Sequence, residues 1–322
     1  MKQLVRVVLV WMILILPAHA NGESAIYIEN EVVTISPELV HVEYDFKNNT
    51  HAALTKLLEI NLPSYSYDPT SRCPDVARRT SHFNLVAKGK VVNPIVSFKA
   101  RLPLTDGSFK DVTPELRSMG FTDDEISNYR NYDVACENDV PMPQGKYEAN
   151  LKRLIKDGLA QEEDFHPTWQ VSEVHSLKQD FGPDETVHVV YEYNPTVGDE
   201  NNNMGPGPVI LKGNSISLGF RDLDKDDARC VILGAPIDTK KASQVQSQFT
   251  FRSILHNVTA DAALYGVVKD FTLKVKKVIQ RNNMSICFDN KISSDDEITL
   301  SSHIKNYLPS KDIIVDYLYQ SN

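Results

Sequence analysis

The chain has 322 residues, of which 41% are hydrophobic, with 34 Lys and Arg against 43 Asp and Glu. This composition excludes a disordered chain and a scaffold held only by disulfides, because it supplies enough apolar side chains for a buried core. The formal net charge is −9. Without residues 1–20, which carry Lys2 and Arg6 and no acid, 32 bases face 43 acids and the charge is −11. Neither nucleic acid nor an anionic membrane surface is therefore an expected partner.

Residues 1–20 have the three-part layout of a secretory signal. A basic start precedes the apolar run Val7–Leu16, and Ala18-His19-Ala20 supplies small residues where a signal peptidase cleaves. A membrane anchor is the alternative, but ten apolar residues at ~1.5 Å each cover only about half of a ~30 Å hydrocarbon core. We therefore expect a signal peptide at 1–20 that is cleaved after Ala20. The mature protein is then periplasmic or secreted and spans no membrane.

Period-two alternation predicts the first strands. Between Leu39 and Phe46, apolar side chains stand at every second position and polar ones between them. This pattern is typical of a half-buried strand with one face on a core. Further strands are expected at 25–35, 54–62, 82–87 and 91–102, with a hairpin turn at Lys88-Gly89-Lys90.

The pattern becomes helical and charged after Asp111. Thr113-Pro114-Glu115 is suited to begin one short helix, and Thr122-Asp123-Asp124-Glu125 has the acidic first turn of a second. A third helix is predicted by an apolar stripe of Tyr147, Leu151, Leu154 and Ile155. We expect a helical insertion at about 111–165, followed by extended structure at 168–181.

Alternation returns in the second half of the chain, at 185–193, 249–254 and 271–275. Short strands between turn residues favour antiparallel sandwiches over a doubly wound sheet. The stretch 194–208 contains turn-forming residues throughout, and it is either a linker or a long loop within one domain. We favour the linker. The predicted fold is mainly β, with two antiparallel β-sandwich-like domains and the helical insertion in the first. The N-terminal domain covers 21–195, the linker 196–208 and the C-terminal domain 209–322.

Four cysteines are present, and no two of them form a CxxC pair. An even number in an oxidising compartment indicates two disulfides, for which three pairings exist. We favour Cys73–Cys136 and Cys230–Cys287, because each pair then lies within one predicted domain. Buried free thiols are the alternative.

Several motifs resemble an uncharacterised bacterial exported family, catalogued as domain of unknown function 4424. The first is the strand Ile35–Asn48, which contains the family pattern SP-x-x-V-x-V-x-Y-x-F-x-N from Ser36 to Asn48. The others follow in the family's order: Ile60-Asn61-Leu62-Pro63, Asp111-Val112-Thr113, Gln179-Asp180-Phe181-Gly182-Pro183, Tyr191-Glu192-Tyr193-Asn194-Pro195, Asp270–Val275 and Ser285-Ile286-Cys287. Together they span nearly the whole mature chain. The resemblance implies export and a β architecture, and it implies no activity.

Two motifs depart from the family. Leu264-Tyr265-Gly266-Val267-Val268 stands where members have W-x-G-P-I, and Leu177 stands near a corner that usually follows a Trp. Both changes are interpreted as core or turn substitutions.

Metal-binding patterns are incomplete. Asp222, Asp224 and Asp226 resemble the first half of a calcium loop, but Asp227 replaces its Gly and Leu233 its bidentate Glu. A solvated acidic turn is the interpretation we favour. The histidines form no HExxH motif, and His166, His175 and His188 are close only in sequence. We expect His188 to point away from the core.

Catalytic motifs are missing as well. The sequence contains no GxSxG and no glycine-rich phosphate loop, although a triad assembled from distant residues is compatible with it. We therefore assign no catalytic, cofactor-binding or metal-binding residue, and only the four cysteines stand as site residues.

Aromatic residues alternate along the strands, and core packing explains them better than a carbohydrate-stacking surface. These residues are Tyr44, Phe46, Tyr191, Tyr193, Phe249, Phe251 and Phe271. Tyr65 and Tyr67 lie in a polar loop and are better candidates for an exposed contact. Glycosylation sequons at Asn48, Asn257 and Asn283 are interpreted as coincidental, given the bacterial resemblance.

Two hypotheses about function follow. The first, which we favour, is a non-enzymatic exported β-sandwich protein that binds an envelope protein or a cell-envelope glycan. The second is an exported hydrolase with a site assembled from scattered residues. A deep pocket with converging His and acidic groups favours the enzyme, and an exposed groove or free sheet edge favours binding.

Overall fold

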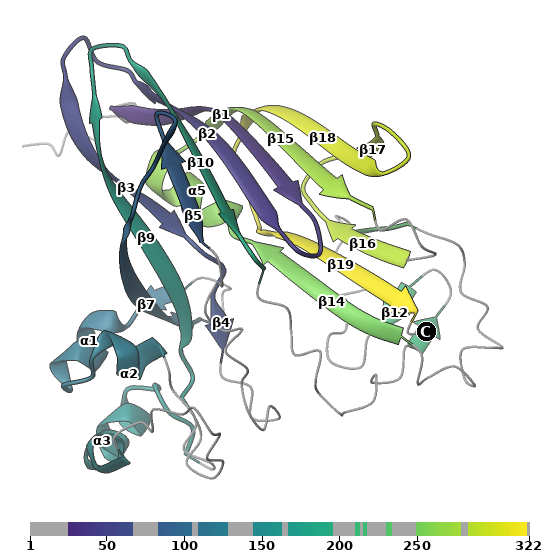
Figure 1. Cartoon of the computed structure of the whole chain (residues 1–322). Helices are drawn as coiled ribbons and strands as arrows, with labels where there is room; N and C mark the ends of the chain where they lie inside the picture. Colours follow the sequence, from purple (N-terminus) through teal and green to yellow (C-terminus); the bar gives the residue numbers. More distant parts are fainter. Residues whose placement is uncertain are drawn as a thin grey trace, which may run out of the picture.

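A computed structural model describes residues 25–66, 83–104, 109–127, 144–162, 167–195, 210–212, 215–217, 230–233, 249–277 and 283–320. β-Strands dominate the described residues, and three helices gather at one end of the long strands β7 and β9 (Figure 1). The fold is thus mainly β, as predicted.

The largest sheet has eight strands in the order β17-β18-β15-β1-β2-β10-β5-β6. All its pairings are antiparallel except that of β1 with β15, which is parallel. Its strands are β1 (Ile26–Ile35), β2 (Val40–Asn48), β5 (Asn84–Ala87), β6 (Lys90–Val91), β10 (Thr186–Tyr193), β15 (Val268–Lys276), β17 (Ser293–Ser294) and β18 (Thr299–Tyr307).

Two smaller sheets lie on one side of the eight-stranded sheet. In the five-stranded sheet the order is β3-β9-β7-β8, with β4 also paired to β9, and in the four-stranded sheet it is β13-β16-β19-β14. The first comprises β3 (Leu54–Asn61), β4 (Tyr65–Ser66), β7 (Ile95–Pro103), β8 (Phe109–Asp111) and β9 (Gln170–Phe181). The second comprises β13 (Cys230–Leu233), β14 (Phe249–His256), β16 (Asn283–Cys287) and β19 (Ile313–Gln320). A separate pair joins β11 (Ile210–Lys212) to β12 (Ser215–Ser217).

One continuous apolar core fills the space between these layers. Along β2 every second side chain is buried and the others are half-buried, as the alternation predicted. The core combines residues from all three sheets, for example Phe271 of the eight-stranded sheet, Leu58 of the five-stranded sheet and Val315 of the four-stranded sheet. The arrangement is therefore sandwich-like, with the eight-stranded sheet covering both smaller sheets.

Segments from both predicted domains contribute strands to the eight-stranded sheet. Strands β15 and β18 belong to the predicted C-terminal domain, 209–322, yet they pair within the sheet that β1, β2 and β10 of the predicted domain 21–195 build. The pairing of β1 with β15 joins both segments through main-chain hydrogen bonds and one shared core. Most of the predicted linker, 196–208, lies outside the described residues.

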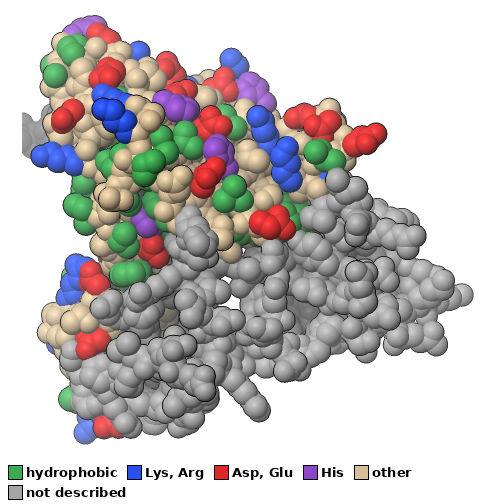
Figure 2. Space-filling view, viewed as in Figure 1, with side chains coloured by type: hydrophobic (Ala, Val, Ile, Leu, Met, Phe, Trp, Pro, Cys, Tyr) green, Lys and Arg blue, Asp and Glu red, His purple; other side chains and the backbone are tan. Residues whose placement is uncertain are grey.

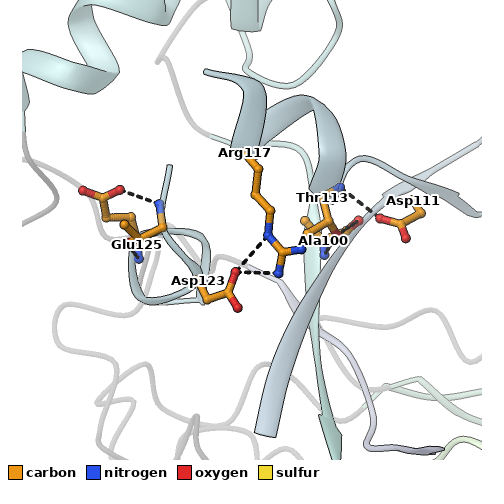
Figure 3. Close-up of polar contacts among 7 residues, drawn as sticks. Ala100, Asp111, Thr113, Arg117, Asp123 and Glu125 are labelled. Carbon is orange, nitrogen blue, oxygen red and sulfur yellow. Dashed lines mark hydrogen bonds and ion pairs between the residues drawn. The ribbon is translucent and has the colours of Figure 1, made fainter. Parts of the chain in front are cut away.

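Three helices lie between β8 and β9, within the stretch 111–165: α1 (Thr113–Ser118), α2 (Asp123–Ser127) and α3 (Gln144–Lys156). The Thr113 hydroxyl accepts a hydrogen bond of 2.8 Å from the Ala100 amide of β7, which fixes α1 against the sheet (Figure 3). The Thr122 amide donates to the Glu125 carboxylate at 2.7 Å, and the Glu125 amide donates back to the Thr122 hydroxyl at 3.3 Å. This reciprocal pair is a capping box, which satisfies amides that the first helical turn leaves open.

Local geometry explains one divided strand. Lys88 and Gly89, with φ of 50° and 72°, form the two-residue turn between β5 and β6. The predicted strand 91–102 then breaks, because Pro94 has no amide proton to donate to a sheet ladder. The chain leaves the eight-stranded sheet after Val91 and enters the five-stranded sheet at Ile95.

Candidate functional site

A cluster of polar groups lies inside the core, on the inner face of the eight-stranded sheet. Its first member is Glu31 of β1, whose side chain is only 1% exposed. A β-bulge between Ile28 and Asn30 shifts the register of β1 against β2. The bulge exchanges the faces of the strand, so that Glu31 points inward where continued alternation would point it to solvent.

Helix α5 (Val258–Tyr265) supplies the second carboxyl group of the cluster. Its Asp261 is 4% exposed and accepts a hydrogen bond of 2.5 Å from the Tyr44 hydroxyl of β2. The start of the helix is held by Asp312, which accepts from the amide and the hydroxyl of Thr259 at 2.9 and 2.6 Å. Just before the start of α5, Nδ1 of His256 lies 3.3 Å from the hydroxyl of the buried Tyr193.

Burial changes the proton affinity of these groups. It raises the pKa of Asp261 to about 7, against the opposing effect of the Tyr44 hydrogen bond and with a further contribution from the Asp312 charge. Burial, and then the nearby Asp261, also hold the pKa of Glu31 well above its usual value. Burial lowers the pKa of His256 to about 4. Among the described residues, Glu31 Oε1 and His256 Nε2 have no hydrogen-bond partner.

This cluster can store protons, but it is closed. Its carboxyl and imidazole groups resemble an acid–base constellation in their shifted pKa values. The side chains of Glu31, Tyr44 and Asp261 are nevertheless almost wholly covered by the core, so a substrate has no approach to them in this conformation. The chemistry that the cluster can perform as it stands is internal proton binding.

The opposite face of the same sheet carries an accessible row of histidines and acids. His41 of β2 contacts Glu192 through Nδ1 at 2.7 Å and Glu43 through Nε2 at 3.1 Å. His188 of β10 contacts Asp45 through Nδ1 at 2.8 Å, and its Nε2 lies 3.9 Å from Glu43. The order is Glu192–His41–Glu43–His188–Asp45, which we call the outer ladder.

The outer ladder lies on the solvent side of the sheet. Figure 2 shows histidine and acidic side chains intermixed over this face, together with basic side chains. The register accounts for the order, because His188 stands opposite Asp45 and Glu192 opposite His41 across β10 and β2. Farther along the sheet, His303 contacts Asp270, and Lys305 lies 3.6 Å from the same carboxylate.

The structure describes two of the three histidines that are close in sequence. His188 points away from the core, as predicted. His175 is buried, stacks on Phe83 with ring centroids 3.6 Å apart, and contacts Glu173 at 2.6 Å. His166 lies outside the described residues. Among the residues that the structure describes, no three His, Cys, Asp or Glu side chains are gathered to hold a metal ion.

The aromatic residues predicted to pack in the core do so where their side chains are described. Tyr44, Phe46, Tyr191, Tyr193 and Phe271 are all buried. Phe249 and Phe251 are placed in β14 by their backbone only, as is Tyr65 in β4, and Tyr67 lies outside the described residues.

The remaining predicted site residues are only partly covered. Cys230 of β13 and Cys287 of β16 are direct partners in the register of the two strands. Cross-strand partners have Cα atoms about 4.5 to 5.5 Å apart, a separation that a disulfide can bridge. Cys73 and Cys136 lie outside the described residues, as do Asp222, Asp224 and Asp226.

The asparagines of two sequons are buried in the fold. The Asn48 side chain is buried and donates to the carbonyls of Ala52 and Gly182 at 2.9 and 2.7 Å. Asn257 is buried directly before α5. Neither side chain is open to modification in the folded protein.

Sequence reasoning missed the buried cluster. It assigned the tyrosines to the core by alternation, but it gave no partners for their hydroxyl groups. One signal was present in the first strand, where the buried apolar positions change from even (Ile26, Ile28) to odd (Val33, Ile35). A change of parity within one strand indicates a bulge, and it points to the residues between as those that change face.

The fold and these surfaces define a mainly β, sandwich-like protein without a recognisable catalytic motif. The chain belongs to the family described as a domain of unknown function, number 4424, which matches residues 19–315. No curated protein matches the sequence. A crystal structure from Legionella pneumophila, described as a "putative nutrient binding protein", shares 11% identity and covers 92% of this chain and 68% of its own, with a TM-score of 0.40. A likeness this low carries no conclusion about ligand or function. Within the described residues, no helix has the length and apolarity needed to cross a bilayer.

Proposed function

We propose that this protein is an exported binding protein, and that the outer ladder recognises another envelope protein. The observation that carries the proposal is the contrast between the two faces of the eight-stranded sheet. The groups with the most strongly shifted pKa values are closed inside the core, whereas His41, Glu43, Asp45, His188 and Glu192 are open to a partner.

The chemistry of the ladder favours a positively charged protein surface. Three carboxylates stand along the ladder, each in contact with a histidine, and its two histidines share Glu43. A partner lysine or arginine can replace a histidine at any of these carboxylates with a charge-assisted hydrogen bond. A glycan instead needs an aromatic platform, and the described aromatic rings of β2 and β10 all point inward.

Export to the periplasm or the medium is part of the proposal. It rests on the signal-like layout of residues 1–20 and on four cysteines suited to an oxidising compartment. Mass analysis of the protein from fractionated cells should find Asn21 as the first residue of the mature chain. A cytoplasmic protein that retains Met1 would contradict this part.

Site-specific photocrosslinking tests the binding surface. A photoreactive amino acid at Val190, which lies between His188 and Glu192 on the outer face, should crosslink to one protein in intact cells. The same probe at Leu308, which is exposed outside this face, is the matched control. The triple change Glu43→Gln, Asp45→Asn and Glu192→Gln should abolish the Val190 adduct. An adduct that persists in this variant, or one that consists of glycan, overturns the proposal.

The hydrolase hypothesis remains as a second proposal because Glu31 and Asp261 are neighbouring buried carboxyl groups with raised pKa values. It requires the core to open. An Asp261→Asn variant of a hydrolase would lose activity against broad esterase, glycosidase and peptidase substrate panels, whereas we expect no activity in either protein.

A further inference from the structure

Strand β3 forms one edge of the five-stranded sheet, and within the described residues it pairs with β9 on one side only. With eight residues it is as long as β14, the edge strand of the four-stranded sheet, and longer than the other edge strands of the three sheets: β6 and β17 have two residues each, β8 has three and β13 has four. Unpaired edge groups invite pairing by another strand, and most proteins keep their edges short for that reason. In Figure 1 the upper part of β3 lies at the left border of the view, and its lower part passes behind β9.

One part of this edge is capped by a side chain. The Tyr265 hydroxyl of α5 accepts from the Glu59 amide at 2.9 Å and donates to the Glu59 carbonyl at 3.3 Å. A single hydroxyl thus bonds both main-chain groups that a neighbouring strand would bond. The same two hydrogen bonds show that the amide and the carbonyl of Glu59 point away from β9.

In the part of the chain that the structure describes, the rest of this edge is unpaired. In an antiparallel ladder the direction of the main-chain groups alternates, so Thr55 and Leu57 point outward as Glu59 does. Among the described residues, no main-chain hydrogen bond reaches Thr55 or Leu57 from the outer side. The side chains here are also exposed, and that of Leu57 is 47% exposed. Two adjacent outward positions beside an exposed apolar side chain suit an extended peptide.

A second copy of this chain fits the edge poorly. The antiparallel register that satisfies Thr55 and Leu57 in both copies places Lys56 directly opposite Lys56 of the second copy. Like charges in directly opposed positions destabilise a strand pair. The same lysine favours a foreign strand with an acidic residue opposite it.

We propose that Thr55–Leu57 of β3 is a strand-addition site for an extended segment of another protein. The segment carries an acidic residue opposite Lys56, flanked by β-branched residues opposite Thr55 and Leu57. Main-chain hydrogen bonds supply the attachment, and Lys56 supplies the selectivity. The site is separate from the outer ladder, so it stands or falls independently of the function proposed above.

The test uses the mature protein and two fluorescent peptides, Ser-Thr-Val-Glu-Val-Thr-Ser and its counterpart with Lys in the centre. Fluorescence anisotropy should show that the Glu peptide binds roughly fivefold tighter, because one opposed charge pair is worth up to about 1 kcal/mol. Lys56→Glu should reverse the preference. A general loss of folding would weaken both peptides equally, so the reversal separates recognition from stability.

Two further variants change the main chain of the edge. Leu57→Pro removes an outward amide without removing a hydrogen bond to β9, so it should abolish binding while the melting temperature stays near that of the native protein. Tyr265→Phe keeps the ring in the core and frees the Glu59 groups, so it should tighten binding. The proposal is wrong if neither peptide binds the native protein, or if Lys56→Glu leaves the preference unchanged.

Discussion

The two faces of the eight-stranded sheet use the same residue types for opposite purposes. On the inner face, burial favours the neutral form of the Glu31 and Asp261 carboxyl groups. On the outer face, Asp45 and Glu192 each contact a histidine and remain partly exposed. The side chains alternate along the same strands, so the environment that each face creates, and not the residue type, decides whether a carboxyl group is neutral inside the core or accessible beside a histidine.

The largest expected effect is on the unfolding free energy, and it comes from the close packing of the inner face. Phe271→Ala empties a fully buried position of β15 and should cost about 3–5 kcal/mol of unfolding free energy. Thr272→Ala, the next residue on the opposite face, should change it by less than about 0.5 kcal/mol. Urea denaturation of both variants measures the difference, and equal losses would contradict the assignment of faces.

The second largest effect on stability is expected in the four-stranded sheet, which packs on the inner face. We expect a disulfide between Cys230 and Cys287, which closes a loop of 287 − 230 = 57 residues. Replacing both cysteines by Ala should cost roughly 4 kcal/mol in the chain-entropy model, and often less in practice. Non-reducing peptide mapping checks the bond directly. A link from Cys230 to Cys73 or Cys136 would refute the pairing.

The third prediction concerns pH and the buried cluster. Asp261 has a raised pKa in the folded state, so its contribution to stability is complete below its unfolded value near 3.8 and is lost as the pH rises to about 7. His256 has a lowered pKa, so its contribution is present above 6.5 and is lost as the pH falls to about 4. The two slopes oppose each other between these limits and partly cancel.

Single substitutions separate the two opposing pH dependences of stability. Relative to the native protein, Asp261→Asn should gain stability from pH 4 to pH 7, by at most about 1.4 kcal/mol per pH unit. His256→Gln should gain relative stability in the opposite direction, from pH 6.5 down to pH 4. Thermal melts across this range test both, and parallel pH profiles for all three proteins would contradict the shifted pKa values.

The smallest effect is expected on the outer face. Glu43→Gln removes the carboxylate that His41 and His188 share, but these side chains are partly exposed and solvent screens their charges. The change in unfolding free energy should stay below about 1 kcal/mol and shrink further in high salt. A larger loss would mean that the ladder serves stability, which would weaken its assignment as a binding surface.

Local patterns predicted the elements well, because alternation and capping depend on neighbouring residues. The faces of β2 and β10, the start of α1 near Thr113 and the turn at Lys88-Gly89 all follow from such patterns. Pairing between distant strands has no local signature, and so β15 was assigned to a separate domain. The buried cluster was missed for the same reason, since Asp261 meets Tyr44 only after β1, β2 and α5 have packed together.

The parallel pairing of β1 with β15 also affects how the chain must fold. Asn30 finds its partner Asp270 only after a further 240 residues have been made (270 − 30). Contacts this distant in sequence slow folding, because the loop must close before the strands gain from pairing. The first strand keeps an open edge, and the largest sheet stays incomplete, until nearly the whole chain is available, a delay that suits the export proposed above.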